Sequence, residues 1–468
     1  MQSVLLHLLG MLTTNLRKKT MSRMCETIGV LLRGRRFYIA VAVCCLLEWL
    51  ALSKVAPNVY FDSDTVSYFY PVNLFIGRIS AIRPPVYCLF LNALRVFGDI
   101  HLKAWVVSSQ FVLMLGTLLL AAKMLRTMFR HEIPVLVASG LLALQGYFWS
   151  KAIDPECFSF CVTVFAIYLY WRMTVAPSKK IVWGLNLLIA FAVLLKPVFM
   201  VLAIALFLAW AFRIFAGDED RGRIKSIVFS YGISVAIVIG YCFLMQGRHG
   251  MFGVSSVSLQ NDLLDIVSSS AWQNCGDSPV KRLLADEMGK SRDPYAGAFA
   301  LQWAVIPTSK DTTDLYATCP EFLFESGNVQ YCYNLQKQYT KGALFSLDAL
   351  QGFIREAKHQ PLYYKYELQK LFLAIGAPQG VLLVPFWLGA ASLVIAWFRR
   401  DHVLFFSNLL FLGFIASVIF KSDMEQNARL LYPVCMVPLM DLLCYFKSAI
   451  AKVDPTVLHN NGKAIEGT

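Results

Sequence analysis

The chain has 468 residues, of which 57% are hydrophobic and only 16% are charged, and its formal net charge is +13 at neutral pH. A soluble domain of this size does not need so much apolar material to fill its core, so the composition excludes an ordinary soluble protein and indicates an integral membrane protein. The basic balance could suggest a nucleic-acid-binding protein, but most of the excess lies at one set of ends of the apolar segments.

Ten apolar segments are long enough to cross a bilayer as helices. The expected fold class is therefore an all-α polytopic membrane protein with about ten transmembrane helices. The segments are residues 37–56, 102–122, 133–151, 156–174, 181–196, 198–215, 226–246, 378–398, 402–420 and 430–446, of which the fifth is the shortest.

Basic residues gather at alternate ends of these segments, and cytoplasmic loops are the ones that retain Lys and Arg. With both termini in the cytoplasm, 22 of the 43 basic residues and 8 of the 30 acidic residues lie on that side. The segment 247–377 carries 12 basic and 13 acidic residues, a near neutrality that is typical of a translocated domain. The sequence therefore predicts cytoplasmic termini and no nucleic-acid partner.

These segments divide the chain into five parts, and no cleaved signal peptide is expected at its start. In the large exterior domain, apolar residues at helical intervals predict two helices separated by Pro361. The parts are a cytoplasmic basic arm (1–36), a transmembrane bundle (37–246) with the first exterior loop (57–101), a large extracytoplasmic domain of mixed loops and short helices (247–377), further spans (378–446) with an exterior loop (421–429), and a cytoplasmic tail (447–468).

Two carboxylates, Asp62 and Asp64, lie just past the first predicted span, where a general base could meet substrates from both water and lipid. Asp64 and Tyr68 are four residues apart, so on a helix they share a face and could act on one ligand. An equally good explanation from spacing alone is that the two acids cap a helix. Asp-Ser-Asp could also bind a divalent cation, although three residues are weak evidence for a metal.

Arg83 precedes Pro84 and Pro85, which bar a helix at Arg83 but allow one to begin directly after them. The apolar stretch that follows, residues 86–98, is too short to span a bilayer and contains polar residues. We therefore expect a helix that lies along the membrane surface.

The pattern Asp64-Thr-Val-Ser-Tyr68, then Gly77, Arg83-Pro84-Pro85-Val-Tyr87 and Phe97-Gly98 resembles the first extracytoplasmic loop of GT-C superfamily glycosyltransferases. The nearest resemblance is to relatives of protein O-mannosyltransferases and of the lipid A aminoarabinose transferase. It implies a GT-C-like fold, a catalytic carboxylate at Asp64 with Asp62 as its substitute, and a donor-phosphate contact at Arg83. These relatives often carry Asp-Glu where this chain has Asp64-Thr65, which leaves one carboxylate at that point.

The second exterior turn contains Lys151, Asp154 and Glu156, which could complete an acceptor or cation site. The alternative is a solvated turn that Asp154 initiates ahead of Pro155, and it is favoured by spacing alone. The resemblance favours a second acidic position in this loop. It also makes Tyr68 and Tyr87 candidates for acceptor contacts or supporting roles.

Two further cations are candidates for binding the donor phosphate. Lys196 precedes Pro197 between two apolar segments, where a lysine is costly unless it faces water or an anion; snorkelling to the membrane surface is the simpler alternative. Glu425 and Arg429 precede the final span and resemble an acidic-then-Arg ending of these transferases. Arg429 could hold a phosphate through paired hydrogen bonds, or it could snorkel at the membrane boundary.

Most of the 12 cysteines lie in or beside apolar segments, where they behave as small apolar residues. Cys275, Cys319 and Cys332 belong to the large exterior domain, where one disulfide with one cysteine left over is plausible, without a choice of partners. The spacing of His and Cys does not resemble a zinc site.

The sequence thus predicts a membrane glycosyltransferase that moves a hexosyl or pentosyl group from a polyprenyl-phosphate donor to a glycan, lipid or protein acceptor, with inversion. We expect it to act on the extracytoplasmic face of a bacterial inner membrane, in cell-envelope glycan, glycolipid or glycoprotein synthesis, with membrane lipids around it and no firm cofactor. Two alternatives stay open: an O-antigen ligase or polysaccharide polymerase, and a polytopic transporter of lipid-linked glycans.

Overall fold

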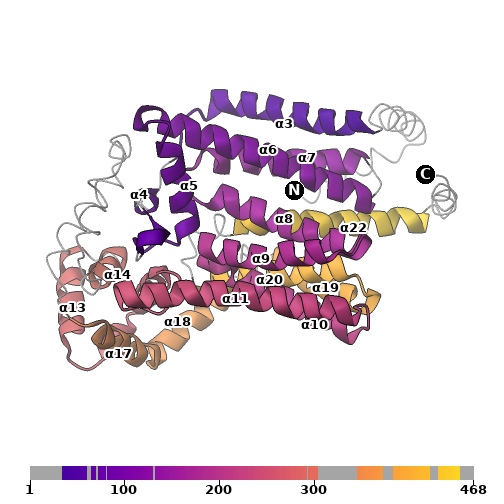
Figure 1. The fold of residues 1–468 in the computed structure, drawn as a ribbon. Helices are drawn as coiled ribbons and strands as arrows, with labels where there is room; N and C mark the ends of the chain where they lie inside the picture. The colour runs from indigo at the N-terminus through magenta and orange to yellow at the C-terminus, as the bar shows by residue number, and fades with distance from the viewer. Residues whose placement is uncertain are drawn as a thin grey trace, which may run out of the picture. The chain divides into compact units, whose positions relative to one another are not determined.

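The computed structural model is built almost entirely of helices (Figure 1). Among the residues that it describes there is no strand, only two isolated backbone bridges, Tyr60–Ala152 and Asn73–Arg78. The described residues are 34–60, 65–69, 72–80, 82–129, 132–291, 294–303, 345–372, 383–421 and 431–453.

Six of the described helical segments are long and apolar enough to cross a membrane, which confirms the all-α membrane class predicted from the sequence. Three more apolar helices are shorter, at Val384–Arg399, His402–Ser417 and Tyr432–Tyr445. The six long segments are Arg35–Val55, Asp99–Phe129, Glu132–Lys151, Glu156–Val175, Pro197–Phe215 and Arg221–His249.

The chain divides into two compact units, of which the first comprises residues 1–57, 114–148 and 442–468. Within this unit, α3 (Arg35–Val55) is held to α7 (Glu132–Lys151) by side-chain contacts with backbone carbonyls. The Trp49 indole donates to the Ala143 carbonyl at 2.9 Å, and the Tyr147 hydroxyl donates to the Ala56 carbonyl at 2.8 Å. These contacts satisfy polar groups that would be costly in lipid.

The second unit comprises residues 58–113 and 149–441, and its central helix is α8 (Glu156–Val175). This helix buries 13 of its 20 residues and has no separate polar face, as expected of a helix surrounded by others. It packs against α9 (Lys179–Leu195) and α20 (His402–Lys421). The wide buried face of α8 explains why its predicted span shows no polar side.

Pro197 separates two helices of this unit, as the sequence predicts. The helix α9 begins after Ser178, whose hydroxyl accepts from the Lys180 amide, and it ends at Leu195. Pro197 cannot continue it and instead opens a short 3₁₀ turn, η3 (Pro197–Phe199), that leads into α10 (Met200–Phe215). Lys196 is thereby left in extended backbone between the two helices.

The long helix α11 (Arg221–His249) has clear signals at both ends. Asp220 caps its start by accepting from the Arg223 amide, and Gly250 ends it in the left-handed conformation with φ of 69°. Its last turn reaches residues 57–101, called the first exterior loop after their predicted position, where Arg248 donates to the Gly77 carbonyl at 2.9 Å.

The described part of residues 247–377 forms a helical subdomain with a hydrophobic core of its own. On α17 the residues Leu350, Phe353, Ile354 and Ala357 are buried, an amphipathic pattern of the kind that the sequence shows. The two helices predicted on either side of Pro361 are confirmed. The helices of this subdomain are α12 (Val257–Ser268), η4 (Ala271–Asn274), α13 (Pro279–Ser291), α14 (Pro294–Trp303), α17 (Leu347–Lys358) and α18 (Pro361–Leu371).

The last part of the chain contributes apolar helices, and two buried polar side chains on them contact each other. Asn408 on α20 donates to the Asp441 carboxylate at 3.0 Å, and both residues are buried. The helices are α19 (Leu383–Arg399), α20, η8 (Tyr432–Val434) and α22 (Met436–Val453).

Candidate functional site

The first exterior loop contains two α-helices, α4 (Thr65–Tyr68) and α5 (Pro85–Arg95). Pro85 occupies the first position of α5, so the helix begins directly after Pro84, one residue earlier than predicted. It is 11 residues long and buries Tyr87, Cys88 and Leu91 on one face. The chain therefore presents Arg83 just before a fixed helix start.

Arg83 is 7% exposed and its guanidinium is held against α4. Nε donates to the Ser67 hydroxyl at 2.6 Å, and Cζ lies 4.7 Å from the centre of the Tyr68 ring. The Arg83 amide also donates to the Ser80 hydroxyl at 3.1 Å. A guanidinium with a fixed orientation in a largely desolvated position interacts more strongly with an anion than one in water does.

Tyr68 and Tyr87 form an edge-to-face pair with ring centres 5.2 Å apart, which joins α4 to α5. The Tyr87 hydroxyl donates to the Gln110 side chain at 2.9 Å. The Gln110 amide nitrogen in turn donates to the carbonyls of Ser150 and Ala152, at 3.0 and 2.8 Å. Gln110 thus connects the first exterior loop with the turn at residues 151–156, called the second exterior turn after its predicted position.

Gln110 was not among the residues predicted for the site. It lies on α6 (Leu102–Phe129) and is completely buried. The sequence does contain a signal for it, because an amide inside an apolar span is costly unless it is hydrogen-bonded. Such a residue is a good candidate for a structural link.

The second exterior turn is buried, so the prediction of a solvated turn is wrong. Asp154 is 1% exposed and Glu156 is fully buried. The Asp154 carboxylate accepts from the Glu156 amide at 2.8 Å and so initiates the turn ahead of Pro155, which is the part of that alternative that the structure supports. The Tyr60 amide donates to the Lys151 carbonyl and the Ile153 amide donates to the Tyr60 carbonyl, and these bonds hold the turn beside Tyr60.

Lys196 forms an ion pair with Glu156, with Nζ 2.7 Å from Oε1. The Lys196 side chain is 13% exposed and that of Glu156 is not exposed at all. Lys196 therefore points to an acid of the second exterior turn rather than snorkelling to the membrane surface. Lys196, predicted to contact the donor phosphate, and Glu156, predicted to support the acceptor, are thus direct partners.

The segment that follows the last exterior loop packs on the same turn. Tyr432 in η8 is 1% exposed and stacks on Trp149 and Phe160, with ring centres 5.3 and 5.0 Å apart. The chain immediately after residue 430 is therefore anchored next to the helix that carries Glu156.

Several predicted residues lie outside the described part of the chain. Tyr60 and Thr65, which flank Asp62 and Asp64 in sequence, are described, and Thr65 is fully buried. Cys275 is described as a buried thiol, so the predicted disulfide stays a prediction. The residues outside the described ranges are Asp62, Asp64, Glu425, Arg429, Cys319 and Cys332.

Metal binding is not supported by the residues that the structure describes, where no group of three or more His, Cys, Asp or Glu side chains could hold an ion. The predicted cation site at Asp62 and Asp64 falls outside those residues. A divalent cation therefore stays a prediction for this protein.

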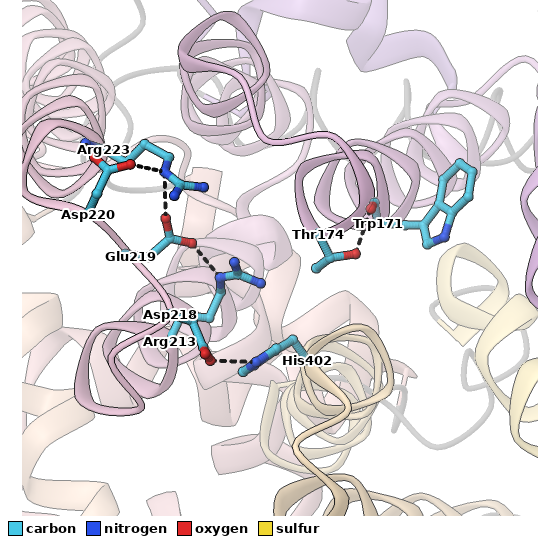
Figure 2. A network of polar contacts seen from close by, with 8 residues as sticks. All are labelled: Trp171, Thr174, Arg213, Asp218, Glu219, Asp220, Arg223 and His402. Atoms are coloured by element: carbon cyan, nitrogen blue, oxygen red, sulfur yellow. Dashed lines mark hydrogen bonds and ion pairs between the residues drawn. The ribbon is translucent and has the colours of Figure 1, made fainter. Parts of the chain in front are cut away.

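A second polar cluster, of which Arg213 and Glu219 are buried, lies at the α10–α11 connection (Figure 2). Arg213 pairs with Glu219 at 2.6 Å, and His402 at the start of α20 contacts Asp218 at 2.8 Å. Arg223 pairs with both Glu219 and Asp220, as Figure 2 shows. No residue predicted for the functional site belongs to this cluster, which ties the connection between α10 and α11 to α20.

Comparison with known proteins gives one match. Residues 63–282, a little under half of the chain, match a family described as a domain of unknown function (DUF6311). The matched range contains α4, α5, Gln110, the second exterior turn and Lys196. No curated protein and no solved structure matches the chain.

Proposed function

We propose that this protein is an integral membrane glycosyltransferase that moves a sugar from a polyprenyl-phosphate donor to an acceptor on the extracytoplasmic face. The proposal rests on the resemblance of the first exterior loop, together with the surroundings of its residues. Its main structural support is the polar cluster that contains Arg83, Tyr68 and Tyr87 and is linked through Gln110 to the turn preceding Glu156 and Lys196.

The contacts among these residues matter because the residues come from four separate stretches of sequence. If these buried charged and polar groups had only a packing role, they would not need to include the residues that the resemblance assigns to the functional site. Buried polar networks are costly unless they are satisfied, and they often mark functional sites. The cluster therefore supports a reaction centre at the first exterior loop.

In the proposed reaction, Asp64 or, in its place, Asp62 removes a proton from an acceptor hydroxyl or amine as that atom attacks the anomeric carbon. The bond from the anomeric carbon to the phosphate oxygen breaks, and the lipid phosphate leaves with the electron pair. Because this leaving group is already a stable anion, no acid has to protonate it. A single displacement of this kind inverts the anomeric configuration.

The cations of the cluster would stabilise the departing phosphate. Arg83 is pre-oriented by Ser67 and Tyr68, so little reorganisation is needed when an anion arrives. Lys196 is held by Glu156 and could shift its contact from that carboxylate to the phosphate. Arg429 would complete the set.

The same proposal assigns the topology and location. It takes the fold to be GT-C-like with ten spans, the termini to be cytoplasmic, and residues 247–377 to be an extracytoplasmic domain above the site. The cluster at Arg213 and Glu219 would then lie on the cytoplasmic side, together with the basic residues that follow it. A bacterial inner membrane is the proposed location.

The test is transfer of a radiolabelled lipid-linked sugar in membrane vesicles that contain Asp64→Asn, Asp62→Asn or the parent protein at equal amounts. We expect Asp64→Asn to abolish transfer and Asp62→Asn to reduce it less. Mass spectrometry of surface glycans from cells with and without the gene identifies the sugar and acceptor for this assay. Normal transfer by the Asp64→Asn, Asp62→Asn double variant would rule out the proposed base.

A further inference from the structure

A pocket of about 750 Å³ lies between the transmembrane helices and the helical subdomain of the second unit. One wall comes from α10 and α11 and includes Met200, Val238 and Ile239. The opposite wall comes from α12 and α17 and includes Leu259 and Ile354. The volume is within the usual range of about 300–1,000 Å³ for small-molecule sites.

The apolar wall runs along α11, which is long and apolar enough to cross a membrane. Cys242 and Val238 lie 7 and 11 residues before the last residue of α11, His249, which at 1.5 Å per residue places them roughly 10–16 Å below that end. Met200 and Ile239 are 49% and 42% exposed, so the pocket is open along its side. An apolar chain could therefore enter it from the bilayer.

The charged part of the pocket lining is basic. Its charged lining residues are Arg355, Lys358 and Asp262, so cations exceed anions by one. Lys358 is paired with Asp262 at 2.9 Å. The Arg355 side chain is exposed and makes no ion pair or hydrogen bond with any other described residue. The surplus positive charge is thus available at the rim.

We propose that this pocket binds a membrane lipid with a net anionic phosphate headgroup. Its apolar chain lies along α10 and α11, and its phosphate is bound by Arg355 with support from Lys358. A guanidinium suits this role because it can donate two parallel hydrogen bonds to phosphate oxygens. A soluble anion would leave the apolar wall exposed, and an uncharged lipid would leave Arg355 without a partner.

This lipid site is distinct from the polar cluster of the first exterior loop. Pro197 lines the pocket, whereas its neighbour Lys196 contacts Glu156. The site therefore has cations of its own. The inference does not depend on the proposed glycosyl transfer, because lipid binding is measured without any reaction.

Native mass spectrometry of the full-length protein in mild detergent tests the proposal with three probes: phosphatidylglycerol, phosphatidylcholine and a polyprenyl phosphate. We expect the anionic probes to be retained more strongly than phosphatidylcholine. Arg355→Glu should weaken their retention about ten-fold or more, because it removes a charge-assisted contact and adds repulsion. Lys365→Glu on α18, an exposed charge reversal outside the pocket, is the matched control and should change little.

Ile239→Trp tests the apolar wall independently, since it fills the pocket without changing charge. Ile237→Trp is its control, because Ile237 is similarly exposed on α11 but does not line the pocket. Preference for phosphatidylglycerol would identify a bulk phospholipid as the ligand. Preference for the polyprenyl phosphate would identify a phosphate monoester. Either result supports the proposed lipid site. Equal retention by the Arg355→Glu and Lys365→Glu variants, or no preference for anionic probes, would overturn it.

Discussion

Lys196 Nζ lies 2.7 Å from Glu156 Oε1, which makes an ion pair of two residues that the sequence assigns to different substrates. The Glu156 side chain is fully buried, so its charge needs a partner. Removal of one member of a buried pair leaves an uncompensated charge, whereas removal of both does not. The two residues must therefore be tested together as well as singly.

We expect Glu156→Gln and Lys196→Met each to destabilise the protein by about 3–5 kcal/mol. The double variant should lose less than the sum of the two, because neither charge is then left alone. Thermal unfolding of the purified protein in detergent measures this. Strict additivity would show that the contact contributes little to stability.

Glu219→Gln provides a matched control for that experiment, because Glu219 is an equally buried acid in an ion pair that lies outside the candidate site. It should lower stability by a similar amount, yet transfer per folded molecule should stay near that of the parent protein. Glu156→Gln should lower transfer per folded molecule as well. If both variants behave alike in transfer, Glu156 has only a structural role.

Gln110→Leu should disrupt the link between the two exterior segments. It removes the acceptor of the Tyr87 hydroxyl and the donors to the Ser150 and Ala152 carbonyls, and each unsatisfied buried group costs about 1–3 kcal/mol. We expect a large fall in thermal stability together with lower transfer. Ser108→Leu, at an exposed position of the same helix, should be close to neutral. A stable and active Gln110→Leu protein would contradict the role of this link.

Arg83→Lys separates charge from geometry at the first exterior loop. Lysine keeps the positive charge but cannot reproduce the planar contact with Tyr68 together with the hydrogen bond to Ser67. We expect transfer to fall roughly ten-fold or more, because a hydrogen bond to a charged group is lost or misplaced. Ser67→Ala removes the hydrogen bond to Arg83 Nε but keeps the guanidinium, and it should cause a smaller loss. Full activity of Arg83→Lys would mean that charge alone suffices.

Local signals allowed much of the fold to be predicted. Proline positions placed the start of α5, the break at Pro197 and the division between α17 and α18, because proline fixes the backbone without help from distant residues. Helix ends were less predictable. The apolar window 226–246 is shorter than α11, since polar residues continue a helix outside the membrane.

The site was harder to predict because its contacts join distant residues. Spacing could not reveal that Lys196 pairs with Glu156, 40 positions earlier, or that Gln110 bridges two loops. The charges around Asp154 suggested solvent exposure, but tertiary packing buries the whole turn. Single residue types indicate what a side chain can do, whereas the partner depends on the topology.

The helical subdomain contains a buried acid whose protonation should affect stability. Burial raises the pKa of Asp265 from 3.8 to about 6, although Lys370, 2.9 Å away, acts in the opposite direction. The folded protein therefore binds this proton more tightly than the unfolded chain does. The associated stability is present below about pH 4 and is lost as the pH rises through about 6.

The measurement compares the parent protein with Asp265→Asn, in which residue 265 stays neutral at every pH. The stability of the parent relative to the variant should fall by about 3 kcal/mol between pH 4 and pH 7, because two pKa units correspond to about that much. Asp277→Asn is a control of opposite sign. A hydrogen bond from Arg282 lowers the pKa of Asp277, so the stability gained from that carboxylate is present at neutral pH and is lost as the pH falls. If the Asp265 difference instead grew with pH, the attraction of Lys370 would outweigh burial, and the carboxylate would stabilise the subdomain in its ionised form.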